Sequence, residues 1–103
     1  MSEIKEITIE DVITTTKKNN RKSDSKLIRK VYNYAKAHHE GQLRKSGEPY
    51  IIHPVQVAYI LSTLGLDDST ICAALLHDVV EDTDITKQDL ENEFGKEIAE
   101  LVD

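Results

Sequence analysis

An unbroken apolar run, Ile71-Cys72-Ala73-Ala74-Leu75-Leu76, occupies the centre of a helix predicted from Asp67 to about Glu81. Six consecutive apolar residues cover every side of a helix, which is typical of a helix buried in the middle of a bundle. Other helices must therefore surround this one. The run indicates an all-α fold in which this segment is central.

The remaining sequence supplies the surrounding helices and shows no strand-like alternation of any length. Thr8-Ile9-Glu10-Asp11 and Thr86-Lys87-Gln88-Asp89 are capping boxes, and Pro54 and Gly65 suit the start and the end of a third helix. We expect Tyr50-Ile51-Ile52 to be extended. The predicted helices span residues 8–18, 25–40, 53–65, 67–81, 86–95 and 96 onward.

Length and composition narrow the class of protein. The 103 residues predict one domain, and a net charge of −6 argues against a general nucleic-acid binder. This charge still permits a phosphate-rich small molecule, provided that a metal ion and a local basic patch offset the acidic background. The single cysteine, Cys72, cannot form an intrachain disulfide, so a buried free thiol and a cytoplasmic location are expected. No signal peptide or membrane span is recognisable.

A metal-site hypothesis comes from two helix ends. His53 opens one predicted helix, and His77-Asp78 closes the next, with Glu81 and Asp82 in the same last turn. Antiparallel neighbours would bring these imidazoles and carboxylates together as ligands for a divalent cation with an activated water. Mn, Fe, Co and Zn all suit such a donor set.

Simpler interpretations stay open for each of these residues. Glu81 and Asp82 alone could be a solvated helix end, although carboxylates there oppose the helix dipole. His53 alone could be a helix-start residue that hydrogen-bonds to backbone. His38 continues the apolar face of the helix predicted over residues 25–40, and for both His38 and His39 a structural role is the better interpretation.

The loop Arg44-Lys45-Ser46-Gly47-Glu48-Pro49-Tyr50 is a second candidate site. An arginine can stack on a base or fork onto a phosphate, a lysine supplies a point charge, and a glycine lets a ligand approach the backbone. The alternative is a polar surface turn.

Together these residues resemble the N-terminal hydrolase part of the RelA/SpoT proteins, the enzymes of the stringent-response alarmone (p)ppGpp. The resemblance runs from about residue 30 to the last residue. The motifs that carry it are His39, Gln42, the loop from Arg44 to Ile51, His53-Pro54-Val55-Gln56-Val57-Ala58, Leu76-His77-Asp78-Val79-Val80-Glu81-Asp82-Thr83, Phe94-Gly95 and Leu101-Val102-Asp103.

The resemblance implies a helical bundle of the HD superfamily, a Mn²⁺ site, and hydrolysis of the 3′-pyrophosphate of (p)ppGpp to GDP or GTP plus pyrophosphate. It implies three kinds of site residue. The metal ligands would be His53, His77 and Asp78. The pair that orients or deprotonates the attacking water would be Glu81 and Asp82. The nucleotide pocket would contain Arg44, which stacks on guanine, together with Lys45, Ser46 and Tyr50.

The chain departs from the family pattern in one respect. The family's fourth metal ligand is an aspartate well downstream, and Asp103 belongs to a different motif. We therefore expect residues 1–103 to be an incomplete hydrolase domain, truncated at the C-terminus, without the synthetase domain of a GTP pyrophosphokinase. Such a bundle would expose an apolar face, so we expect self-association or marginal stability. The competing hypotheses are a phosphohydrolase for another nucleotide and a non-catalytic guanine-nucleotide-sensing module.

Overall fold

The computed structural model describes residues 7–39 and 52–102, which form α-helices and no strands. This confirms the all-α prediction for the described part of the chain. The bounds of the helices, in chain order, are α1 Ile9–Asn19, α2 Ser25–His39, α3 Ile52–Thr63, α4 Asp68–Asp82, α5 Lys87–Phe94 and α6 Lys96–Val102.

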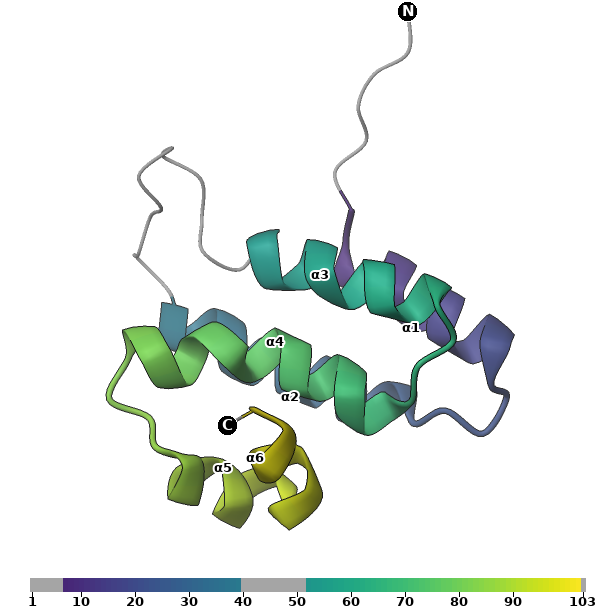
Figure 1. Cartoon of the computed structure of the whole chain (residues 1–103). Helices are drawn as coiled ribbons and strands as arrows, with labels where there is room; N and C mark the ends of the chain where they lie inside the picture. Colours follow the sequence, from purple (N-terminus) through teal and green to yellow (C-terminus); the bar gives the residue numbers. More distant parts are fainter. Residues whose placement is uncertain (1–6, 40–51, 103) are drawn as a thin grey trace, which may run out of the picture.

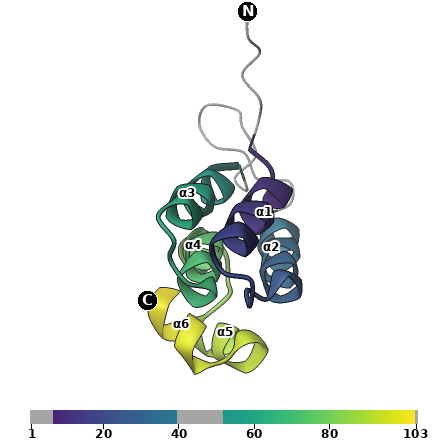
Figure 2. The same cartoon turned by 90° about the vertical axis from the view of Figure 1, so that its right-hand side faces the viewer.

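Helix α4 lies at the centre, packed against α2, α3 and α6, and α1 covers α2 and α3 from the other side (Figures 1 and 2). Ile71, Cys72, Leu75 and Leu76 have no exposed surface. The prediction of a central buried helix is thus confirmed. The other fully buried aliphatic side chains, which form the core with this run, are Val12, Ile28, Val31, Ala35, Ala58, Val79, Leu90 and Ala99.

The capped helix ends form where the sequence predicts them, because local side chains satisfy the free backbone groups there. Thr8 and Thr86 both form complete capping boxes, with Asp11 and Asp89 respectively, and Asp67 accepts a hydrogen bond from the Thr70 backbone N–H at 3.0 Å. Gly95 ends α5 with a positive φ of 100°.

Two expectations about individual residues are wrong. Ile52 is helical rather than extended, so α3 begins two residues before Pro54. Pro54 does not prevent this, because the backbone N–H groups of the first turn have no partner in the helix and a proline is tolerated there. His38, expected on the apolar face of its helix, is exposed, and His39 is buried instead. Glu40, Tyr50 and Ile51 lie outside the described residues.

Candidate metal centre

The last turn of α4 carries the candidate metal ligands. Leu75, Leu76 and Val79 anchor this half of the helix in the core, so His77 and Glu81 lie on its solvent side. Their side chains are 58% and 64% exposed, whereas that of Asp78 is 21% exposed. The three side chains therefore sit at the surface on a helix whose opposite face is fixed by packing.

A cap at the end of α4 fixes the position of this turn. The Thr83 backbone N–H donates to the Val79 carbonyl at 3.1 Å, and the Thr83 hydroxyl donates to the same oxygen. The Thr83 hydroxyl oxygen also accepts a hydrogen bond from the Ile85 backbone N–H at 3.1 Å. The helix thus ends at a defined point just beyond the candidate ligands.

His77, Asp78 and Glu81 each offer one ligand atom, and these atoms all lie within 4.8 Å of one another. The Nδ1 atom of His77 lies 3.3 Å from Oδ1 of Asp78, and its Nε2 atom lies 3.9 Å from Oε1 of Glu81. Ligand atoms about 2.1 Å from a shared ion would be separated by roughly 3–4 Å, which small side-chain rotations can reach. The predicted crowding of the last turn is thus confirmed for His77, Asp78 and Glu81, and Asp82, which we predicted with them, is not part of this group.

The chemistry of this group fits a transition-metal cation. A carboxylate only accepts hydrogen bonds, so a bond between His77 and Asp78 places the imidazole proton on Nδ1. The lone pair of Nε2 is then free to bind a metal, in the arrangement that commonly orients metal-binding histidines. Two carboxylates at the negative end of a helix dipole also favour a cation nearby.

The structure does not bring every predicted ligand into this group. His53 is an exposed residue in the first turn of α3, and Asp82 is exposed at the last position of α4. The antiparallel arrangement of α3 and α4 directs the start of α3 toward the C-terminal half of α4 (Figure 1). Arg44, Lys45, Ser46 and Tyr50 lie outside the described residues.

Sequence reasoning missed a second feature, a cavity of about 350 Å³ between α2 and α5. The rings of Tyr34 and His38 contact each other there in a tilted arrangement, with centroids 4.4 Å apart and planes at 53°. Burial, and then the negative charges of Asp89 and Glu93, raise the pKa of Tyr34 above its usual value. The residues involved are about fifty positions apart in sequence, so no local spacing pattern signals this cavity.

The chain belongs to the HD domain family, whose model matches residues 31–103. HD domains are metal-dependent hydrolases, and the His77–Asp78–Glu81 group is a candidate metal site in this chain. None of the helices in the described ranges is long and apolar enough to cross a membrane.

Curated relatives confirm the resemblance to the RelA/SpoT proteins. The chain is 60% identical over 76 residues to guanosine-3′,5′-bis(diphosphate) 3′-pyrophosphohydrolase of Vibrio cholerae, and 59% identical over 78 residues to the bifunctional (p)ppGpp synthase/hydrolase SpoT of Escherichia coli. It is 52% identical over 80 residues to a GTP pyrophosphokinase of Myxococcus xanthus. These matches cover 74%, 76% and 78% of the chain, but 11% of each relative.

Proposed function

We propose that this chain forms part of a metal-dependent hydrolase that removes the 3′-pyrophosphate of (p)ppGpp, giving GDP or GTP and pyrophosphate. The observation that carries the proposal is the clustering of His77, Asp78 and Glu81 at one end of the central helix. Relatives named for this reaction match the same part of the chain. Because the chain spans only 11% of their length, the complete activity is proposed for a longer parent protein.

In this proposal, His53, His77 and Asp78 hold the metal, which we propose to be Mn²⁺. The bound ion would polarise a phosphoryl oxygen and lower the pKa of a water molecule. Asp78 orients the His77 ring through Nδ1 and leaves Nε2 facing Glu81. Glu81 and Asp82 would orient the attacking water and accept its proton, since both are exposed carboxylates in the same turn.

The substrate's guanine and phosphates would contact the segment that precedes α3. We propose that Arg44 stacks on the guanine and that Lys45, Ser46 and Tyr50 complete the nucleotide pocket. These residue types supply the planar cation, the point charge and the hydroxyl groups that a guanosine polyphosphate can use. We also propose a cytoplasmic location, which the buried free thiol of Cys72 supports.

The test is release of pyrophosphate from ppGpp with Mn²⁺, measured for this chain and for its full-length parent. In the active protein, we expect Asp78→Asn to reduce turnover by at least about a hundredfold, because metal-bound carboxylates supply charge that an amide lacks. Asp84→Asn is the matched control, since it removes the same charge from an exposed residue just beyond α4.

Turnover that survives Asp78→Asn would overturn the proposed metal centre. Equal turnover of guanosine and other nucleotide substrates would instead favour an HD phosphohydrolase of broader specificity. Binding of ppGpp without turnover in the full-length protein would favour a nucleotide-sensing module.

A further inference from the structure

The positive charge of this acidic chain is concentrated in one segment. Residues 17–36 contain eight of the thirteen Lys and Arg residues, but only one of the nineteen Asp and Glu residues. This segment comprises the end of α1, the connection and most of α2. None of these residues belongs to the candidate metal centre.

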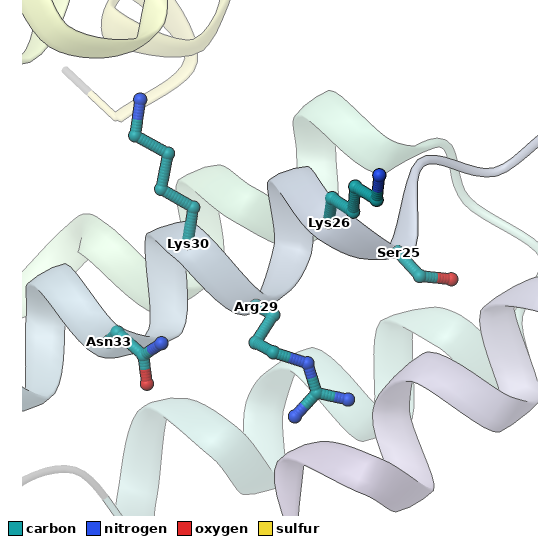
Figure 3. Close-up of a pocket in the computed structure, with 5 residues that line it drawn as sticks. All are labelled: Ser25, Lys26, Arg29, Lys30 and Asn33. Carbon is teal, nitrogen blue, oxygen red and sulfur yellow. The ribbon is translucent and has the colours of Figure 1, made fainter.

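The structure gathers part of this charge around a groove of about 380 Å³ on the outer face of α2. Ser25, Lys26, Arg29, Lys30 and Asn33 line the groove (Figure 3). They share one side of the helix because they recur at intervals of three and four residues. Their neighbours Ile28 and Val31 are fully buried on the other side.

Contacts from two other helices hold two of the three cations in place. Arg29 pairs with both carboxylate oxygens of Glu10 on α1, with one nitrogen–oxygen distance of 2.8 Å. The Nζ atom of Lys30 lies 4.0 Å from Oε2 of Glu93 on α5 and 5.6 Å from the centre of the Phe94 ring. Figure 3 shows the two side chains diverging from the two edges of this face of α2, Arg29 toward α1 and Lys30 toward the α5–α6 pair.

The third cation, Lys26, is exposed and makes no hydrogen bond or ion pair with any residue in the described ranges. The Ser25 hydroxyl and the Asn33 amide add neutral donors beside it. Guanidinium, ammonium, hydroxyl and amide groups are all hydrogen-bond donors, so the groove is suited to a ligand with many acceptor oxygens.

We propose that this groove binds a compact polyphosphate anion, meaning a diphosphate or triphosphate group, either inorganic or part of a nucleotide. A volume of about 380 Å³ lies at the lower end of the range of small-ligand sites, which is about 300–1,000 Å³. Lys26, Arg29 and Lys30 outnumber the paired carboxylates of Glu10 and Glu93 by one charge. The groove does not depend on the metal centre, so this proposal stands independently of the proposed hydrolysis.

The test is calorimetric titration of this chain with inorganic pyrophosphate and tripolyphosphate in EDTA, which prevents metal-bridged binding at the His77 group. We expect Lys26→Gln/Lys30→Gln to weaken pyrophosphate binding about tenfold or more, because each charge-assisted hydrogen bond contributes substantially. Lys18→Gln/Lys96→Gln is the matched control, which removes the same charge at exposed positions outside the groove. We expect less than about a twofold change for the control, since distant surface charges are screened.

Further titrations identify the source of the ligand. Tighter binding of GDP than of pyrophosphate would assign the groove to a nucleotide's diphosphate, and the reverse order would assign it to the inorganic anion. Equal affinity for sulfate at matched ionic strength would overturn the proposal, since it would show diffuse charge rather than a site. Equal loss of binding in both double variants, or preference for a single-stranded RNA, would also overturn it.

Discussion

At the scale of single residues, burial decides the chemistry of Cys72. Its side chain has no exposed surface, and burial raises the pKa of its thiol to about 12, with smaller effects from the charges of Asp68, Asp24 and Asp67. The thiolate is the reactive form of cysteine. Cys72 should therefore be inert in the native protein, as the sequence-based expectation of a buried free thiol requires.

We expect the native protein at about pH 8 to react with a disulfide reagent about a thousandfold more slowly than the urea-unfolded chain. The reason is that a pKa near 12 leaves roughly one thiol in ten thousand ionised. The absorbance of the thiolate that the disulfide reagent releases measures both rates. Comparable rates in the two states would show that Cys72 is accessible.

At the scale of helices, one carboxylate anchors the start of the central helix. Asp67 caps α4, and hydrogen bonds from the Thr70 hydroxyl and the Thr70 backbone N–H lower the pKa of Asp67 below its usual value. A depressed pKa means that the charged form stabilises the folded state. This contribution is fully present above the pKa that Asp67 has in the unfolded chain. It is lost as the pH falls through the lower pKa that Asp67 has in the folded protein.

Asp67→Ala should lower the free energy of unfolding by about 1 kcal/mol at neutral pH, the usual cost of removing an N-cap. The difference from the unsubstituted protein should shrink as the pH falls through the lowered pKa of Asp67, because its carboxylate then becomes protonated. Urea denaturation at neutral pH and along an acidic pH series measures this difference. Asp84→Ala is the control, and a difference that stays constant with pH would contradict this role of Asp67.

The junction between α5 and α6 depends on a glycine. Gly95 has φ 100° and ψ 162°, a region of backbone conformation that is essentially restricted to glycine. A Cβ atom there would meet nothing within 4 Å, so a substitution would be opposed by the backbone conformation and not by packing.

Gly95→Ala should therefore lower the free energy of unfolding by about 1–3 kcal/mol, the cost of such a conformation for a residue with a Cβ. Lys96→Ala at the neighbouring exposed position should change it by less than about 0.5 kcal/mol. Thermal or urea unfolding followed by circular dichroism compares the two. Equal effects of the two substitutions would show that backbone conformation at Gly95 is unimportant.

At the scale of the whole molecule, apolar side chains remain on the surface around the end of α3. Ile60, Leu64 and Leu66 are 56%, 68% and 41% exposed. Large exposed apolar groups this close in sequence favour association with another apolar surface. They are the physical basis for the self-association that we predict.

At high concentration, we expect light scattering to give this chain a mass above the monomer mass of 11.7 kDa. We expect the double variant Ile60→Glu/Leu64→Glu to have a mass closer to that of the monomer. Thr14→Glu on the exposed side of α1 is the control, and it should leave the mass distribution unchanged. A stable monomer for the unsubstituted chain across the concentration range would contradict self-association.

The helices and the crowding at the end of α4 can be predicted from the sequence, because both depend on interactions within about four residues. The capping boxes at Thr8 and Thr86 and the apolar run of α4 correctly predicted where the helices lie. Helix periodicity likewise brings His77, Asp78 and Glu81 onto one turn. The roles proposed for them, for His53 and for the Arg44 loop stay predictions.

Helix packing determines which side chains become buried and which side chains from different helices meet. It buries His39 in place of His38, and it joins Tyr34 to a cavity beside Asp89. It also places α1 and α5 where Glu10 and Glu93 hold two cations of the α2 groove. These pairings join residues between about twenty and sixty positions apart, and helix packing rather than backbone periodicity sets the distance between such residues.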